Sequence, residues 1–565
     1  MKTTKNIARL AVTAGLTAAL SFGGVMAPVS MAFAEGTTTA NGSVTIENVE
    51  DNTTEFDGYQ IFKADVATNG TVSNITWANT NVQHAVESFI QAEDESYEGT
   101  TAQDAADWIT KKVEGTGKTT RVEFGSIPYK IADRVDGLTA SATTFNKTVS
   151  GLEHGYWLFV TKADTIGVGE AGTSPIFTVV GDTPVEVNEK TGIPTVEKKI
   201  VSDADGKEYD AADSHIGQDV TYNLYGTVAE NFDKYGTYFY QFSDQISKGL
   251  TLQEGAKVYL YKNKNDAKAD LARTKGTDIT TNFIKSTDAA AEDGSITTKW
   301  TCDNLKTVKG VTKDSYIVVS YTARINEHAI VAGTESNNNA VILKYSNNPM
   351  DKDSKGQTPP DTVKDYTYGL KINKVDLGTE TKLPNAQFTI TTNGDGKNEE
   401  VKYVDDKGKL STNEVILTTN GDGAITLTGL DAGVYTVKEV SAPDGYTSVD
   451  SFTFTIKPTM TDDGPAAGLT EVTGELNTSQ TTKVIAGLND TSAGKVGDNK
   501  LDFKADTLTN TDGTFNITVG DSKQVGLPLT GLNGVTFTWI AGGAALCIGT
   551  AHLIRSRKRD DGSEE

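Results

Sequence analysis

The run Phe452-Thr453-Phe454-Thr455-Ile456 alternates large apolar residues with threonines. Successive side chains of a β-strand point to opposite faces, so this period of two predicts a strand with one buried and one solvated face. The run Val220-Thr221-Tyr222-Asn223-Leu224 has the same period, and similar segments separated by Gly, Asp and Asn turns fill most of the chain. This pattern is typical of antiparallel β-sandwich domains, and the predicted fold class is therefore mainly β.

Part of the first third departs from this alternation. Apolar residues recur there at three- and four-residue spacing in two segments, namely Val82, Ala85, Val86, Phe89 and Ile90, and Ala102, Ala105, Ala106 and Ile109. Such spacing places apolar side chains on one face of an α-helix. We therefore expect helical insertions on an N-terminal β domain.

Length and composition predict several domains in a row. The chain has 565 residues, which is too many for a single core. A Gly/Pro turn at residues 189–194 suits a domain boundary, and the polar, proline-containing stretch 347–365 suits a semi-extended linker. The prediction is three tandem β-sandwich domains at residues 35–190, 191–360 and 361–526.

The N-terminus has the composition of a secretory signal peptide, predicted at residues 1–34. A positive region with Lys2, Lys5 and Arg9 precedes an uncharged apolar stretch, and an A-x-A cleavage site follows at residues 32–34. A membrane anchor that is retained is the alternative interpretation. The short, Ala/Gly-rich apolar stretch and the cleavage site favour a cleaved signal.

The C-terminus combines three features in order over residues 527–565. The pentapeptide Leu527-Pro528-Leu529-Thr530-Gly531 is followed by an apolar run at 535–554, long enough for a transmembrane helix, and by basic residues at 555–559. This arrangement resembles the LPXTG cell-wall sorting signal of Gram-positive surface proteins. The resemblance implies that a sortase cuts between Thr530 and Gly531 and transfers the Thr530 carboxyl to an amine.

Composition argues against several functional classes. The formal net charge of −24 argues against nucleic-acid binding, which requires basic patches. The scattered histidines and the two cysteines, Cys302 and Cys547, form no metal-ligand spacing, and no phosphate-binding loop or nucleophile elbow is found. We expect no metal, no cofactor and no enzyme activity on other molecules. With Cys547 in the C-terminal apolar run, no disulfide within the mature chain is expected.

Strand parity predicts three polar side chains inside the third domain, which are Lys374, Glu439 and Asp521. Each lies on the same face as apolar residues of its own strand, namely Leu370 and Ile372, Tyr435 and Val437, and Phe515, Ile517 and Val519. Burial of polar groups is costly unless they meet. Burial also favours a neutral lysine amine, which is nucleophilic, and a neutral carboxylic acid, which can donate a proton.

Motifs in this domain resemble the B-type domain of collagen adhesins, an immunoglobulin-like family that often contains a spontaneous isopeptide bond from a lysine to an asparagine or aspartate. Residues 374–376 and 383–388 read Lys-Val-Asp and Leu-Pro-Asn-Ala-Gln-Phe, like the opening of that domain. Residues 435–439 and 442–446 read Tyr-Thr-Val-Lys-Glu and Ala-Pro-Asp-Gly-Tyr, like its E-box.

The resemblance implies that Lys374 attacks Asp521 with Glu439 as proton donor. The family usually has an asparagine as acceptor, so Asn516 is an alternative to Asp521. A plain buried salt bridge between Lys374 and Glu439 is the other interpretation.

The middle domain contains a second set. Lys198, Asp244 and Asn347 each share a face with apolar residues of their strands. Residues 194–199 (Pro-Thr-Val-Glu-Lys-Lys) and 345–349 (Tyr-Ser-Asn-Asn-Pro) resemble A-type domains of major pilins. By the same chemistry Lys198 is expected to attack Asn347 with Asp244 as proton donor, and the adjacent Asn348 is a rival acceptor that points outward.

The first domain has no inward lysine on its first predicted strand, residues 43–46, so no bond is expected there. Its last residues, 185–190, read Val-Glu-Val-Asn-Glu-Lys and resemble the pilin motif V-x-V-Y-P-K, with Asn-Glu in place of Tyr-Pro. The resemblance implies that Lys190 is the nucleophile for a pilin-class sortase. An ordinary surface lysine is the alternative.

Together these features resemble a major (backbone) fimbrial subunit of Gram-positive bacteria. The resemblance implies a secreted protein joined head to tail through Thr530 and Lys190 and finally anchored to peptidoglycan. The implied partners are a pilin-class and a housekeeping sortase, other pilin subunits and a possible host or matrix ligand. A monomeric wall-anchored adhesin and an ancillary pilin remain alternatives.

Overall fold

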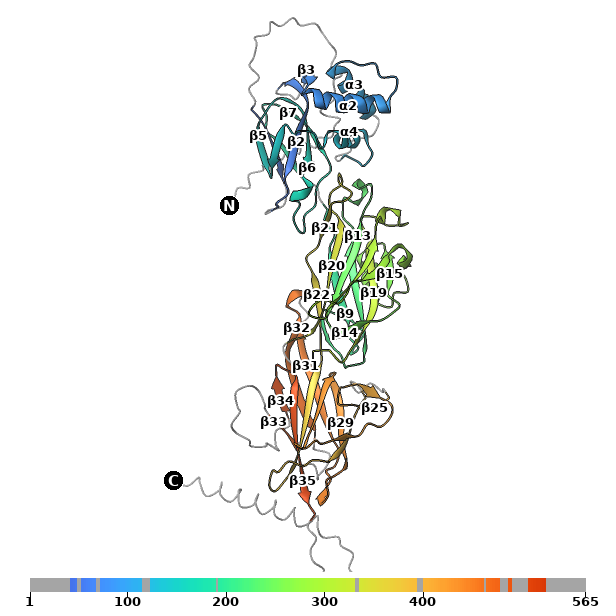
Figure 1. The fold of residues 1–565 in the computed structure, drawn as a ribbon, viewed down its shortest axis with the longest axis vertical. Coiled ribbons are helices and arrows are strands. Elements are labelled where there is room, and N and C mark those ends of the chain that lie inside the picture. The colour runs from blue at the N-terminus through green and yellow to red at the C-terminus, as the bar shows by residue number, and fades with distance from the viewer. Residues whose placement is uncertain are drawn as a thin grey trace, which may run out of the picture.

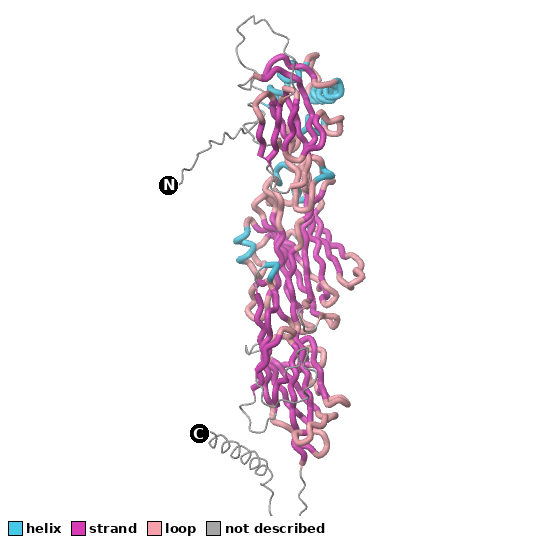
Figure 2. Tube along the Cα trace, turned by 90° about the vertical axis from the view of Figure 1, so that its left-hand side faces the viewer, coloured by secondary structure: helices cyan, strands magenta, loops and turns pink. Residues whose placement is uncertain are grey.

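The computed structural model shows three β domains arranged in line in an elongated molecule (Figures 1 and 2). The N-terminal domain lies at one end and the C-terminal domain at the other. The structure describes residues 41–47, 52–67, 72–113, 122–188, 192–330, 335–393, 400–461, 464–477, 486–489 and 507–524.

The first domain contains two small sheets and a helical layer. One sheet has the order β5-β1-β8 and the other β3-β2-β6-β7 with β4 on β2. The strands are β1 (Gly42–Glu47), β2 (Phe56–Val66), β3 (Val72–Trp77), β4 (Ala142–Phe145), β5 (Thr148–Leu152), β6 (Gly155–Thr161), β7 (Ile176–Val180) and β8 (Val185–Asn188). The helices α2 (Thr80–Glu93) and α3 (Ala102–Val113) confirm the predicted helical insertions, and both pack their apolar faces into the core.

A third helix in this domain, α4 (Ile127–Val135), was not predicted from the sequence. Ser126 is its N-cap and accepts a hydrogen bond from the backbone N–H of Tyr129, and Pro128 lies in its first turn. A capping serine followed by a first-turn proline is a recognisable start signal for a helix. The helix is short, and its apolar repeat was too brief to stand out.

The middle domain is a sandwich of two seven-stranded sheets. One has the order β10-β9-β12-β19-β15-β16 with β14 on β19, and the other β11-β22-β20-β13-β18-β17 with β21 on β20. The strands of the first are β9 (Val196–Val201), β10 (Glu208–Tyr209), β12 (Asp219–Thr227), β14 (Leu250–Leu252), β15 (Lys257–Tyr261), β16 (Thr277–Asp278) and β19 (Tyr316–Ile325). Those of the second are β11 (Ala211–Asp213), β13 (Tyr240–Ile246), β17 (Ile284–Thr287), β18 (Ile296–Cys302), β20 (Asn337–Ser346), β21 (Lys355–Gln357) and β22 (Asp361–Tyr366). A short helix, α5 (Lys264–Ala269), follows β15.

The C-terminal domain is also a two-sheet sandwich. Its sheets have the orders β28-β23-β35-β30 with β33 on β35, and β26-β25-β24-β29-β31-β32-β34 with β27 on β24. The first is built from β23 (Tyr368–Asp376), β28 (Ala424–Leu430), β30 (Tyr446–Thr447), β33 (Ala486–Asn489) and β35 (Thr514–Lys523). The second is built from β24 (Gln387–Thr392), β25 (Lys402–Val404), β26 (Leu410–Ser411), β27 (Leu417–Thr418), β29 (Gly433–Ser441), β31 (Phe452–Thr461), β32 (Gly468–Asn477) and β34 (Thr507–Asn510). The first and last strands, β23 and β35, are parallel neighbours.

The predicted linker at residues 347–365 is wrong. Its second half forms β21 and β22, which pair with β20 in the middle domain, and the chain changes domain between Tyr366 and Tyr368. Its first half contacts the N-terminal domain, where the backbone N–H of Gly172 donates to the carbonyl of Asn347 at 2.6 Å and Met350 packs against the core. Polar composition alone did not distinguish a linker from a strand pair that buries few large side chains.

The predicted terminal signals lie outside the described residues. This applies to residues 1–34 and 527–565, and also to Lys190, which was predicted to be the sortase-linkage residue. Within the described part of the chain, no helix is both long and apolar enough to cross a bilayer.

Candidate crosslinking sites

The middle domain holds a lysine sealed between its two sheets. Lys198 projects inward from β9 and its side chain is 0% exposed. Its Nζ donates to Asp244 Oδ1, to Asn339 Oδ1 at 2.5 Å and to the hydroxyl of Tyr321 at 3.1 Å. Lys198 and Tyr321 come from one sheet, and Asp244 (β13) and Asn339 (β20) come from the other. This group of four residues is called the middle cluster below.

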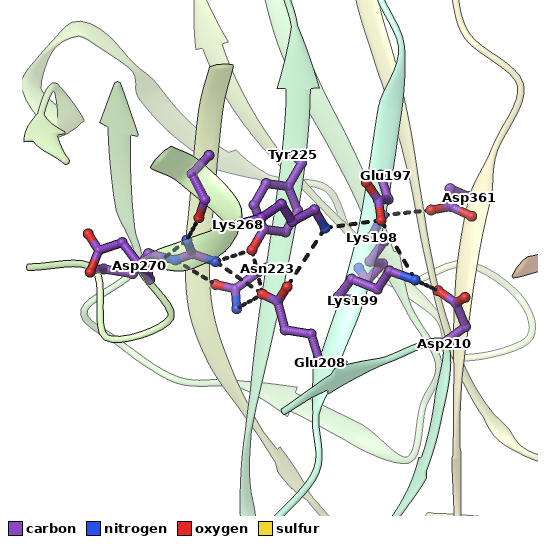
Figure 3. Close-up of polar contacts among 12 residues, drawn as sticks. Glu197, Lys198, Lys199, Glu208, Asp210, Asn223, Tyr225, Lys268, Asp270 and Asp361 are labelled. Atoms are coloured by element: carbon purple, nitrogen blue, oxygen red, sulfur yellow. Dashed lines mark hydrogen bonds and ion pairs between the residues drawn. The ribbon is translucent and has the colours of Figure 1, made fainter. Parts of the chain in front are cut away.

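The contacts that fix β9 explain why Lys198 points inward (Figure 3). The backbone N–H of Lys198 donates to Asp361 Oδ2 at 2.6 Å, which ties β9 to β22 of the opposite sheet. The neighbouring Lys199 and Glu197 point the other way, where they pair with Asp210 at 2.6 Å and Lys268 at 3.0 Å. Side chains alternate between the two faces of a strand and β9 is anchored on both faces. Of the three consecutive residues 197–199, therefore, Lys198 is the one that points into the core.

Burial changes the chemistry of the Lys198 amine. Desolvation lowers its pKa to about 8, against the opposing attraction of Asp244. The aromatic rings of Tyr222 and Tyr321 lie 5.6 and 5.5 Å from Nζ and contribute apolar surroundings for the amine. A lysine whose pKa is about 8 has a substantial neutral, nucleophilic fraction near neutral pH.

Asn347, predicted as the acceptor of Lys198, is not in the middle cluster. Its Oδ1 accepts a hydrogen bond from Ser354 Oγ at 2.7 Å, near the boundary with the first domain. Asn339 occupies the expected place and lies on the same face of β20, eight residues earlier, which corresponds to about 26 Å along a strand. The rival Asn348 is also absent from the cluster, since its Oδ1 accepts from the backbone N–H of Met350 at 3.0 Å.

The register of β13 against β20 explains this correction. Asp244 pairs with Val341 and Ile246 with Asn339, so the carboxylate of Asp244 lies near the start of β20. Parity correctly selects the face, but Asn339 and Asn347 have the same parity. The hydroxyl of Tyr321 also escaped sequence analysis, because an inward tyrosine on an apolar strand is usually only a core residue.

The C-terminal domain holds the second buried lysine. Lys374 Nζ donates to Glu439 Oε2 at 2.9 Å and to Asp521 Oδ1, and all three side chains are 0% exposed. The parallel pairing of β23 and β35 places Asp521 beside Asp376, two residues beyond Lys374. The backbone N–H of Val449 donates to Glu439 Oε2 at 2.9 Å and orients that carboxyl group. Lys374, Glu439 and Asp521 are called the C-terminal cluster below.

The structure brings together the three residues predicted for the C-terminal cluster. Burial raises the pKa of Asp521 to about 7, although the neighbouring Lys374 acts in the opposite direction. Within the described residues, Glu439 Oε1 and Asp521 Oδ2 have no hydrogen-bond partner. The alternative acceptor Asn516 pairs in register with Lys371 and lies five residues before Asp521, so it projects from the other face of β35.

The first domain differs from the other two. Its buried polar side chains, within the described residues, are threonines, a serine and a glutamine, with no lysine among them. Its last strand, β8, ends at Asn188, two residues before Lys190.

Part of the C-terminal domain is similar to a known family. The family model SpaA, described as a prealbumin-like fold domain, matches residues 369–465. This segment is similar to SpaA prealbumin-like domains and is called the SpaA domain below. The SpaA domain contains Lys374 and Glu439, whereas Asp521 follows the matched segment and is supplied by β35.

Similarity extends beyond the SpaA domain. The chain is 27% identical over 281 residues to the trypsin-resistant surface T6 protein of Streptococcus pyogenes serotype M6, covering 47% of this chain and 46% of the relative. The chain thus spans about half the length of that curated relative.

Solved structures of pilins are also similar. The T6 backbone pilin of serotype M6 Streptococcus pyogenes matches with a TM-score of 0.49 and 17% identity, covering 87% of this chain and 100% of that one. The full-length major pilin SpaD from Corynebacterium diphtheriae matches with a TM-score of 0.42 and 15% identity, covering 86% and 98%. The SpaA match and the T6 relative confirm the predicted resemblance to Gram-positive major pilins.

Proposed function

We propose that this protein is the repeating shaft subunit of a covalent surface pilus. In this proposal a pilin-class sortase joins the Thr530 carboxyl of one subunit to the Lys190 amine of the next. A housekeeping sortase finally attaches the polymer to peptidoglycan. Such a head-to-tail contact is heterologous and does not close, so it propagates a fibre.

One observation carries the proposal. Each of the two domains between residue 190 and residue 530 contains a fully buried lysine that touches a carboxyl group and a side chain, Asn339 or Asp521, whose carbonyl carbon could donate an acyl group to the amine. These domains follow one another in line (Figure 1). Internal crosslinks in these domains would transmit tension between the two linkage points, and in the described part of the chain Cys302 is free and forms no disulfide.

The middle cluster has the groups for an amide bond between Lys198 and Asn339. The neutral amine attacks Asn339 Cγ, a C–N bond to Nζ forms, the bond from Cγ to Nδ2 breaks, and ammonia leaves. Asp244 accepts a proton from Nζ and returns one for the leaving group, so its own charge is unchanged at the end.

The C-terminal cluster has the groups for a bond between Lys374 and Asp521. Lys374 Nζ attacks Asp521 Cγ, one carboxyl oxygen leaves as water, and Glu439 shuttles the proton. A pKa of about 7 keeps a large fraction of Asp521 as the neutral acid near neutral pH, which is a better electrophile than a carboxylate.

Intact mass of the mature chain tests the internal bonds. The parent should weigh less than its sequence by one ammonia and one water. Asn339→Ala should weigh less than its own sequence by one water only, whereas the matched control Asn347→Ala should lose both ammonia and water, as the parent does. A parent mass equal to the sequence, or loss of the bond in Asn347→Ala with retention in Asn339→Ala, would contradict the assignment.

Polymerisation is tested by substitution of Lys190. Lys190→Ala and Lys190→Arg should abolish the high-mass ladder in boiled cell-wall extracts, because alanine has no amine and a guanidinium stays protonated. The control Lys207→Ala removes an exposed lysine of the next domain and should leave the ladder intact. A single band in parent extracts would instead indicate a monomeric wall-anchored adhesin, and parent protein seen only in polymers of another subunit would indicate an ancillary pilin.

A further inference from the structure

We propose that the hydroxyl of Tyr321 is a catalytic proton relay for formation of the Lys198–Asn339 bond, an inference that rests on the internal bond proposed above. This oxygen touches every group that changes during the reaction. It donates to Asp244 Oδ2 at 2.5 Å, accepts from Asn339 Nδ2 at 2.8 Å and accepts from Lys198 Nζ at 3.1 Å.

The reaction requires a proton to move between two nitrogens. Lys198 Nζ loses one proton when it becomes an amide nitrogen, and Asn339 Nδ2 must gain one to leave as ammonia. Asp244 is hydrogen-bonded to Nζ through Oδ1, but within the described residues no hydrogen bond joins Asp244 to Asn339. The Tyr321 hydroxyl bridges the two, so it completes the path that Asp244 alone does not provide.

The transfer balances without any other reactant. Nζ attacks Asn339 Cγ as the neutral amine, while Asp244 is a carboxylate. On collapse of the tetrahedral intermediate, the Tyr321 proton moves to Nδ2 as the electron pair of the C–N bond leaves with that nitrogen. A proton then passes from Nζ, now bonded to Cγ, through the Asp244 carboxyl to the Tyr321 oxygen, and both residues end as they began.

Packing holds the hydroxyl in position. The Tyr321 ring is stacked with the rings of Tyr222 and Trp300, each with its ring centroid 5.5 Å away and with interplanar angles of 22° and 26°. A donor held in place by its neighbours needs no reorganisation when the proton moves.

The C-terminal cluster supports this role by contrast. There Lys374 contacts both the proton donor Glu439 and the acceptor Asp521, and within the described residues no tyrosine hydroxyl is hydrogen-bonded to any of the three. The leaving group at Asp521 is water, which is expelled far more readily than ammonia. The relay is therefore present where the leaving group is poor.

The experiment compares Tyr321→Phe with Tyr222→Phe in the mature chain. Tyr222 is a matched control, because it is similarly buried and its ring lies as close to Lys198. Its hydroxyl donates to Asp365 at 3.3 Å and, within the described residues, not to Asp244, so it cannot carry a proton between Asp244 and Asn339. Each protein is expressed under conditions that keep it unfolded, so that the Lys198–Asn339 bond has not formed. It is then refolded from denaturant, and the loss of ammonia is followed over time by intact mass. Tyr321→Phe should form the bond about a hundredfold more slowly or worse, whereas Tyr222→Phe should match the parent.

A second measurement separates catalysis from packing. Fluorinated tyrosine at position 321 keeps the hydroxyl but changes its acidity, so the rate should change, while the same replacement at position 222 should have no effect. A parental rate in Tyr321→Phe, equal slowing in both phenylalanine variants, or no response to fluorination overturns the relay while the bond itself stands. A parent that never loses ammonia overturns the proposed bond, and the relay with it.

Discussion

The position of each proposed bond determines how much of its domain can unfold under tension. In the pilus, force would enter the middle domain after Lys190, pass from Lys198 to Asn339, and leave through β22 into the C-terminal domain. Lys198 and Asn339 are 141 residues apart in sequence, and the bond between them would carry the force past this segment, so that tension could not unfold it. The 147-residue separation between Lys374 and Asp521 would be shielded in the same way.

The unshielded lengths differ between the two domains. In the C-terminal domain only the ends of β23 and β35 would carry the force outside the bond. These strands are already extended, so they can release almost no extra length. In the middle domain about 27 residues, from Asn339 to Tyr366, remain, and they can release at most about 90 Å at ~3.4 Å per residue. Without the bond, the stretch from Val196 to Tyr366 would release about 580 Å by the same measure.

Single-molecule force spectroscopy measures these lengths directly. Handles attached through Lys190→Cys and the Thr530 end reproduce the proposed geometry, since Cys302 is buried and does not compete. The parent should show no step longer than about 90 Å, whereas Asn339→Ala should add a step of several hundred Å. The control Asn347→Ala should behave as the parent. A step of several hundred Å in a parent whose mass shows both bonds would refute the shielding.

Further predictions concern buried carboxyl groups. Glu439→Gln should leave the C-terminal cluster unjoined, so that the mature chain retains one water by mass, while Glu475→Gln, in an exposed ion pair, should lose it normally. Burial raises the pKa of Asp365 well above its usual value, so its stabilising contribution is complete below about pH 4 and is lost as pH rises. Asp365→Asn should therefore raise Tm at pH 8 by about 5 °C and leave it nearly unchanged at pH 4, as measured by calorimetry. Equal shifts at both pH values would show that this carboxyl does not titrate on unfolding.

Much of the fold and of both clusters could be predicted from residue alternation. A period of two fixes which side chains enter the core, and it placed Lys198, Asp244, Lys374, Glu439 and Asp521 correctly inside. Buried ionisable groups are costly, so their inward placement also indicates that they meet.

The position along a strand could not be predicted in this way. Asn339 and Asn347 have the same parity, and only the pairing of β13 with β20 decides which of them faces Asp244. That pairing depends on the lengths of the connections and on packing between sheets, neither of which appears in a local pattern. The stretch 347–365 shows the same limit, because its strands bury few large side chains and are held by hydrogen bonds to β20.

Two predictions from the sequence were corrected: Asn339 replaces Asn347 in the middle cluster, and the predicted linker 347–365 contains strands. Together these corrections change how tension would be distributed in the proposed shaft. A bond at Asn347 would have removed β20 from the path, whereas a bond at Asn339 leaves β20, β21 and β22 within it. The segment between β20 and β22 is also the one that contacts the first domain, through the Asn347 carbonyl and through Gln357, whose carbonyl accepts from Gly169 N–H at 3.1 Å. Force on the shaft would therefore act on the residues that hold the first domain in place, although that domain lies outside the line between the two linkage points.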